Sequence, residues 1–158
     1  MKNTRWSLIA GKDVNAITSQ EALDKGGLNW NVLQSPIQFN NGESIVIDNS
    51  HRVNYRSDTK SVLGLVSDTY KVLQNKDAFK FLDSVVGVAE AMYVNVGSFR
   101  NGSKVYIQAK LQDKLTFDDN GEDIGEKYLT FVTSHDGSLP VSVMFTPIRI
   151  VCQNTLLS

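Results

Sequence analysis

Hydrophobic and polar residues alternate along much of this chain, which is the pattern of β-strands with one buried face. The clearest case runs from Met92 to Leu111, where two alternating segments flank Arg100-Asn101-Gly102, a sequence suited to a tight turn. A second pair of segments, Ile37–Phe39 and Ser44–Asp48, flanks Asn40-Asn41-Gly42. Both patterns predict antiparallel hairpins.

Further extended segments are predicted from the same alternation. Gly64 lies inside one of them, where a glycine marks a bend or a close approach of another backbone. The last two flank Ser134–Ser138, whose residues favour a turn. In chain order, these segments are residues 53–56, 62–66, 128–133 and 141–145.

Two stretches have the signals of helices. Thr18 is followed three residues later by Glu21, which forms a capping box, and Gly26-Gly27 provides a stop. Residues 74–89 carry one apolar stripe at helical spacing, with Asn75 as the expected N-cap of a core-packing helix. The predicted fold class is α+β, with antiparallel hairpins forming a curved sheet and one or two packing helices.

Composition sets limits on the class of protein. A chain of 158 residues is the size of one domain, and its 41% hydrophobic and 21% charged residues are typical of a folded protein. We therefore expect a single domain over residues 1–158. No apolar run approaches the length of a membrane span, and Cys152 is the only cysteine. We expect a cytoplasmic protein with no disulfide and no membrane partner.

Ser134, His135 and Asp136 suggest a hydrolase at first sight. A catalytic triad needs its three side chains to line up, and three adjacent residues point in different directions. Asp136 and Gly137 are also typical of a tight turn. We therefore predict no catalytic residue, and an enzyme that uses His135 and Asp136 ranks last among the hypotheses. These two residues either contact a ligand or only close the turn.

Cofactor and metal sites find no support in the sequence. The acidic segment of residues 118–126 offers oxygen ligands but lacks the spacing of a calcium loop, and is expected to be a solvated loop. Two histidines and one cysteine argue against a zinc site. No glycine-rich phosphate-binding motif occurs. We predict no cofactor, no metal and no enzymatic activity.

A local basic surface is the remaining candidate site, because a net charge of −1 does not suit binding of nucleic acid by bulk charge. Basic side chains with interleaved aromatic rings suit single-stranded nucleic acid, since phosphates are neutralised while bases stack. The alternative is an ordinary solvated sheet face. Arg149 is included because a charge on an apolar strand must reach water or a partner. The candidate residues are Arg52, Tyr55, Arg56, Arg100, Lys104, Tyr106, Lys110 and Arg149.

Several stretches, in this order and spacing, resemble the phage/plasmid-like protein family, a domain of unknown function. The resemblance implies a protein of a mobile genetic element in the host cytoplasm, and it brings no catalytic residues. It also leaves open that the chain is the amino-terminal part of a longer family domain. The matching segments are residues 21–32, 63–86, 97–111 and 128–156.

Two functions follow as hypotheses. The first is a nucleic-acid-binding accessory protein, with single-stranded DNA as the expected partner. The second is a protein-interaction or oligomerising module that acts on a host or phage protein, for example in counter-defence, through an exposed sheet. The element order is also reminiscent of single-strand annealing proteins, which is an analogy of fold alone.

Overall fold

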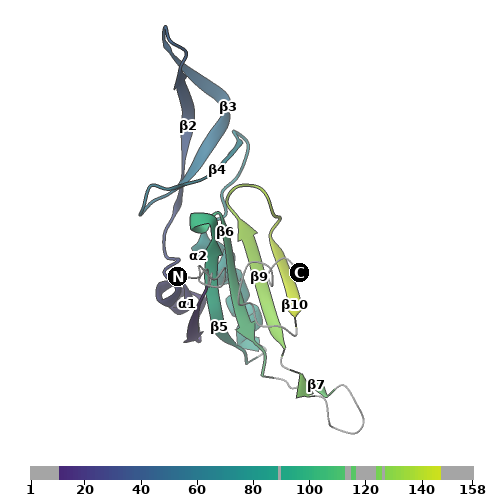
Figure 1. The fold of residues 1–158 in the computed structure, drawn as a ribbon. Helices are drawn as coiled ribbons and strands as arrows, with labels where there is room; N and C mark the ends of the chain where they lie inside the picture. The colour runs from purple at the N-terminus through teal and green to yellow at the C-terminus, as the bar shows by residue number, and fades with distance from the viewer. Residues whose placement is uncertain (1–10, 89, 113–114, 117–123, 126, 147–158) are drawn as a thin grey trace, which may run out of the picture.

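The computed structural model describes residues 11–88, 90–112, 115–116, 124–125 and 127–146 (Figure 1). These residues form two α-helices and antiparallel sheets, which confirms the α+β prediction. The elements are β1 (Gly11–Ala16), α1 (Ser19–Gly26), β2 (Val32–Asn40), β3 (Ile45–Arg56), β4 (Val62–Ser67), α2 (Asn75–Val88), β5 (Met92–Phe99), the 3-10 turn η2 (Arg100–Gly102), β6 (Lys104–Lys110), β7 (Leu115–Thr116), β8 (Ile124–Gly125), β9 (Tyr128–Ser134) and β10 (Ser142–Thr146).

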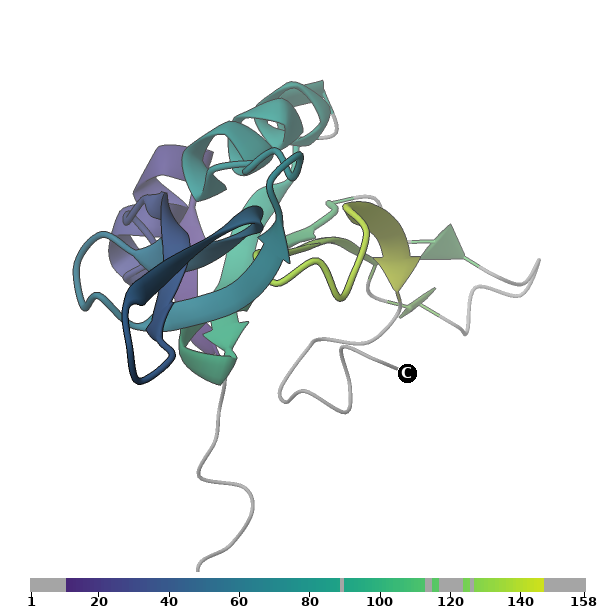
Figure 2. The same cartoon turned by 90° about the horizontal axis from the view of Figure 1, so that it is seen from above.

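A five-stranded sheet in the order β1-β5-β6-β9-β10 is the centre of the molecule. Both helices lie against one of its faces (Figure 2). Phe79 of α2 meets Phe131 of β9 edge to face, with ring centroids 5.5 Å apart. Leu23 of α1 and Ile107 of β6 are fully buried in the same core. The central hairpin is therefore the predicted one, and β1, which the sequence analysis did not anticipate, completes the edge.

Helix α1 begins and ends as predicted. The Thr18 hydroxyl accepts from the Glu21 amide at 3.2 Å, and Gly27 adopts the left-handed conformation with φ of 71°. Asp83 of α2 joins the two helices, because its carboxylate accepts from both the amide and the hydroxyl of Ser19, at 2.8 and 2.7 Å. A charge-assisted contact of this kind fixes the N-terminus of α1 against α2.

The expected N-cap of α2 is wrong. The Ala78 amide bonds to the carbonyl of Gln74, so Gln74 precedes the helix and Asn75 is its first residue. The Asn75 side chain is buried and donates to the Leu28 carbonyl at 3.1 Å. Asn75 therefore joins the helix to the rest of the core instead of capping it.

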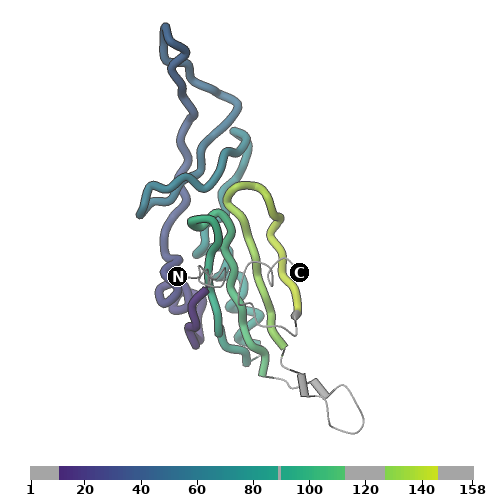
Figure 3. Tube along the Cα trace, viewed as in Figure 1, coloured from purple at the N-terminus to yellow at the C-terminus, as the bar shows by residue number. Residues whose placement is uncertain are grey.

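Strands β2, β3 and β4 form a second, three-stranded sheet, which we call the arm. The arm projects away from the central sheet (Figure 3). Its hairpin turns at the predicted place, where the side chains of Asn40 and Asn41 accept from backbone amides and Gly42 has φ of 97°. The hairpins are thus divided between two sheets, and residues 45–56 form one long strand with a register shift after Asp48.

The Gln74 side chain holds the start of the arm against the segment that leads into α2. Its side-chain amide accepts from the backbone N–H of Val32 at 2.8 Å and donates to the carbonyl of Val32 at 2.9 Å. Val32 begins the arm and Gln74 immediately precedes α2. The Gln74 side chain therefore bonds both backbone groups of Val32, as a neighbouring strand would, at the point where the arm begins.

The acidic segment of residues 118–126 was expected to be a loop throughout, but Ile124 and Gly125 form part of a short ladder. Leu115 pairs with Gly125, and Thr116 pairs with Ile124. The residues between them, including the acidic ones considered as oxygen ligands, lie outside the described part of the chain.

The arm touches the body most closely at Gly64, as its position in a strand predicted. A Cβ atom at Gly64 would lie 2.6 Å from the Cβ and 2.7 Å from the Cα of Asp136. Real atoms do not approach this closely, so the arm seats against the Ser134–Ser138 turn only because residue 64 has no side chain.

Replacing Gly64 with alanine is therefore expected to lower the free energy of unfolding by about 1–3 kcal/mol, because Asp136 must move. The matched control is Gly87→Ala, since a Cβ at Gly87 meets nothing within 4 Å. That control should leave stability unchanged or raise it by up to about 1 kcal/mol, since alanine favours a helix. Urea denaturation measures both variants. Equal effects of the two substitutions would show that the close approach of Gly64 to Asp136 does not determine the loss of stability.

Candidate functional site

The structure places two of the expected nucleic-acid-binding residues in the interior. Tyr106 is 1% exposed and packs with Phe99 and Val132 in a second apolar cluster, on the face of the sheet opposite the helices. Lys104 is 7% exposed. The expectation that Tyr106 stacks a base from an exposed face is therefore wrong, because both faces of β6 are covered.

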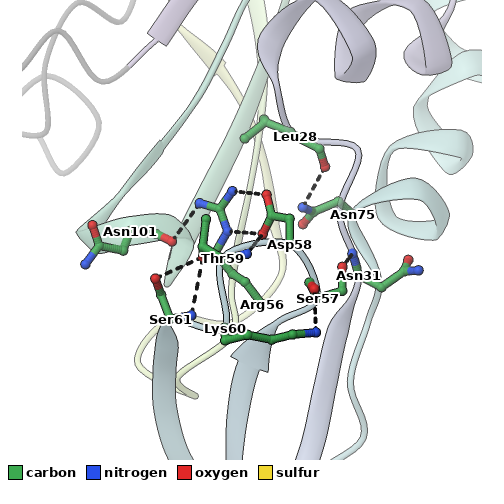
Figure 4. A network of polar contacts seen from close by, with 10 residues as sticks. All are labelled: Leu28, Asn31, Arg56, Ser57, Asp58, Thr59, Lys60, Ser61, Asn75 and Asn101. Atoms are coloured by element: carbon green, nitrogen blue, oxygen red, sulfur yellow. Dashed lines mark hydrogen bonds and ion pairs between the residues drawn. The ribbon is translucent and has the colours of Figure 1, made fainter.

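Arg56 is a structural residue at the base of the arm (Figure 4). Its guanidinium donates twice to the Asp58 carboxylate, at 2.9 and 2.7 Å, and once to the Asn101 carbonyl at 3.0 Å. The same group lies over the Trp30 ring, 4.4 Å from its centroid. The side chain is only 16% exposed. Its donors are thus engaged within the protein, where they link the arm to the turn between β5 and β6.

The remaining basic candidates do not gather on one face. Arg52 is half-buried in the arm and donates to the His51 carbonyl at 2.9 Å. Arg100 is exposed in the turn that precedes β6, whereas Lys110 ends that strand and is half-buried. Arg100 and Lys110 therefore lie at opposite ends of β6, roughly 20 Å apart for a strand of this length. Arg149 lies outside the described residues.

The start of the turn of residues 134–138 is a buried joint between the arm and the body, since Ser134 and His135 are buried whereas Gly137 and Ser138 are exposed. The ring of His135 contacts the Asn75 side chain through Nε2 at 2.8 Å and meets Trp30 edge-on. Its backbone N–H donates to the Ser103 carbonyl at 2.7 Å, and its carbonyl accepts from the Asn54 side chain at 2.8 Å. His135 is 1% exposed. Of the two roles left open by the sequence, these contacts support closing the turn.

Burial lowers the pKa of His135 from 6.5 to about 4, although the neighbouring Asp136 carboxylate opposes this change. Burial raises the pKa of Asp136, but hydrogen bonds from Ser138 and the charge of Lys104 outweigh it, and the pKa stays below 3.8. At neutral pH the turn therefore holds a neutral imidazole beside a carboxylate. This state suits a buried joint, because an unpaired buried charge would be costly.

A second cluster of serine, histidine and aspartate occurs in the arm, and the sequence analysis missed it. The Ser50 hydroxyl contacts Asp48 Oδ1 at 2.6 Å and His51 Nδ1 at 2.9 Å, while the same Nδ1 lies 2.8 Å from Asp48 Oδ2. A catalytic relay needs the serine and the acid on different nitrogens of the imidazole. Here both meet Nδ1, so the cluster is not arranged as a relay. Its hydrogen bonds instead hold the strand together at the point where its register shifts.

The outward surface of the arm is apolar, and we call it the outer face. Side chains directly opposite each other in antiparallel strands share a face, and the register pairs Leu33 with Tyr55, Tyr55 with Val62, and Val53 with Leu65. Leu65 is 63% exposed and Val62 60%. We call Leu33, Val53, Tyr55, Val62 and Leu65 the apolar residues of the outer face, and the same register places Ser35 opposite Val53 and His51 opposite Ser67 on this side.

The opposite side of the arm rests on the body. Asn54, Val66 and Val32 are buried there, and Gly64 meets Asp136. Strand alternation in the sequence identified the apolar positions of the arm, but it gave no signal of which side the body covers. Tyr55, expected to contact nucleic acid, is half-buried on the outer face among apolar neighbours.

Within the part of the chain that the structure describes, no helix is long and apolar enough to cross a lipid bilayer. The described residues also contain no group of three or more histidine, cysteine, aspartate or glutamate side chains placed to hold a metal ion.

Fold and site together define an α+β protein whose central sheet carries a projecting three-stranded arm. The family model described as "Domain of unknown function (DUF932)" matches residues 62–157, which is more than half of the chain. The chain therefore belongs to the DUF932 family. No curated protein and no solved structure matches it. The narrower resemblance to phage/plasmid-like proteins stays a prediction.

The low pKa of His135 has a consequence for acid stability. The unfolded chain binds a proton at this histidine near pH 6.5, whereas the folded protein binds it only near pH 4. The contribution of neutral His135 to the free energy of unfolding is therefore fully present above pH 6.5. It is lost as the pH drops toward 4, by about 3 kcal/mol in total. Thermal unfolding followed at pH 7.5, 6.0 and 5.0 measures the slope.

The chain has only two histidines, so His51→Gln is the matched control and should keep this slope. His135→Gln is expected to be less stable at neutral pH and to lose the slope between pH 6.5 and 5. If His135→Gln keeps the slope, the acid sensitivity comes from other groups.

Proposed function

We propose that this protein is a non-catalytic protein-interaction module, and that the outer face of the arm is its contact surface. The observation that carries the proposal is the exposure of apolar side chains from all three strands on one face of a structured sheet. Leu65 and Val62 leave more than half of their surface in water, although they have apolar partners across the strands. Contiguous apolar patches of this kind mark interaction sites on soluble proteins.

The hairpin beyond the outer face adds to this support. Phe39 pairs with Val46 on one side of the hairpin and is 53% exposed, while Ile45 and Ile47, at 67% and 55%, lie on the other side. Two-stranded hairpins are marginally stable in water on their own. Apolar residues on both sides of such a hairpin suit burial against a second protein.

Binding of single-stranded nucleic acid, the first hypothesis from sequence, has less support. That hypothesis depends on a surface of basic and aromatic side chains. Lys104 and Tyr106 are buried, and Arg56 donates to groups within the protein, so these three residues do not form such a surface. Arg52 and Arg100 remain on different elements. The class of partner that we propose is therefore a protein.

The setting of this function is proposed from the sequence alone. A single cysteine suits a reducing compartment, and the resemblance to phage and plasmid proteins suits the cytoplasm of a bacterial host. An interaction module in that setting acts on a host or phage protein, for example in counter-defence, or on another copy of itself.

A photoreactive phenylalanine analogue at position 65 tests the contact surface in cells that express the protein. We expect covalent adducts with protein, because the outer face is occupied in the cell, and loss of these adducts when Val62→Asp places a charge beside the probe. Position 81 is the matched control, since Phe81 on α2 is also 63% exposed. Absence of adducts at position 65, or equal adducts at both positions, would refute the proposed surface.

Fluorescence anisotropy with labelled single-stranded DNA across a salt series tests the nucleic-acid alternative. We expect affinity no tighter than nonspecific binding, with a dissociation constant of about 10⁻⁶ M or weaker at physiological salt. The paired variant Arg52→Ala with Arg100→Ala should leave it unchanged. Tight, salt-sensitive binding that this variant weakens would instead favour a nucleic-acid function.

A further inference from the structure

We infer that the partner of the outer face is a second copy of this chain, and that two arms pack face to face in a symmetric dimer. This inference rests on the proposed function, because it names the occupant of the same surface.

The charge pattern of the outer face suits contact with itself. In a symmetric dimer, the same patch lies on both sides of the interface, so a charged residue there meets its own kind. The outer face has four aliphatic side chains, one tyrosine, Ser35, Ser67 and His51, and so presents neither carboxylate nor ammonium groups there. Asp48, on the same side nearer the tip, keeps its carboxylate bonded to Ser50 and His51. Two such faces can meet without burying like charges.

The edges of the arm favour packing through faces and not strand addition. β2 is an edge strand and contains Pro36, and proline in an edge strand limits pairing with a further strand. Gln74 occupies both backbone groups of Val32 on β2, and on β4 the Leu63 carbonyl accepts from the Ser103 hydroxyl at 2.8 Å. Strand addition at either edge would therefore meet backbone groups that are already engaged.

The position of the body selects one arrangement of the two arms. The central sheet and both helices lie at the base of the arm, and the hairpin tip points away from them (Figure 1). Two arms that pack with both bases at the same end would bring the bulky bodies together. An antiparallel arrangement keeps the bodies apart and places the tip of each arm over the base of the other. Phe39 near the tip then meets Leu65 at the base of the second copy.

One face of a single three-stranded sheet is small for an interface, so we expect a weak dimer. Sedimentation velocity between about 1 and 300 µM should show a monomer–dimer equilibrium with a dissociation constant in the micromolar range. Phe39→Glu and Leu65→Lys should each raise this constant about tenfold or more, because each buries a charge in the interface. Both side chains are more than half exposed in the single chain, so folding should be preserved, as circular dichroism checks.

Mixing the two variants tests the arrangement. A dimer of one Phe39→Glu copy and one Leu65→Lys copy pairs the introduced charges at one contact and keeps the native contact at the other, so the mixture should associate more tightly than either variant alone. Phe81→Lys on α2 is the control and should leave the dimer unchanged.

A protein that stays monomeric over the whole concentration range would overturn the second-copy inference, as would a dimer that only Phe81→Lys disrupts. Failure of this inference differs from failure of the proposed function. A monomer that still forms adducts with another protein through position 65 keeps the interaction module and changes only its partner, whereas a monomer without such adducts loses both. A dimer in which mixing gives no rescue contradicts the antiparallel arrangement.

Discussion

The insertion of His135 between the arm and the body is the interaction on which the rest of this structure depends. Its backbone bonds to Ser103 and Asn54, and its ring contacts Asn75 and Trp30. Four segments distant in sequence therefore meet at one buried residue. Such a joint favours a neutral imidazole, because the ring and both backbone groups of His135 are already bonded to buried partners. It leaves the arm oriented outward with one side covered and the other open to water.

Local features were predictable from the sequence because they depend on neighbouring residues. The Thr18 cap, the Gly27 stop and the hairpin turn at Gly42 all follow from side chains within a few positions. Strand alternation also located most of the strands. Tyr106 and Lys104 were misjudged for a physical reason, since period-two alternation separates two faces of a strand but does not say whether the second face meets water.

The candidate site was predictable only in part for the same reason. The apolar positions of the arm are visible in the sequence, yet the division of the hairpins into two sheets depends on contacts such as Gly64 against Asp136. The serine, histidine and aspartate of the turn suggested chemistry because their residue types are reactive. Burial converts them into structural groups, so residue type without surroundings was a poor guide to their role.

The family match begins at residue 62, so only β4 of the arm lies within it, while β2 and β3 precede it. Gln74 is the physical link across this boundary, because its amide holds Val32 directly before α2 starts. The start of the arm is therefore bonded to the segment that follows the arm and leads into α2. Because Gln74 directly precedes α2, any displacement of β2 at Val32 acts on the start of that helix through these two hydrogen bonds.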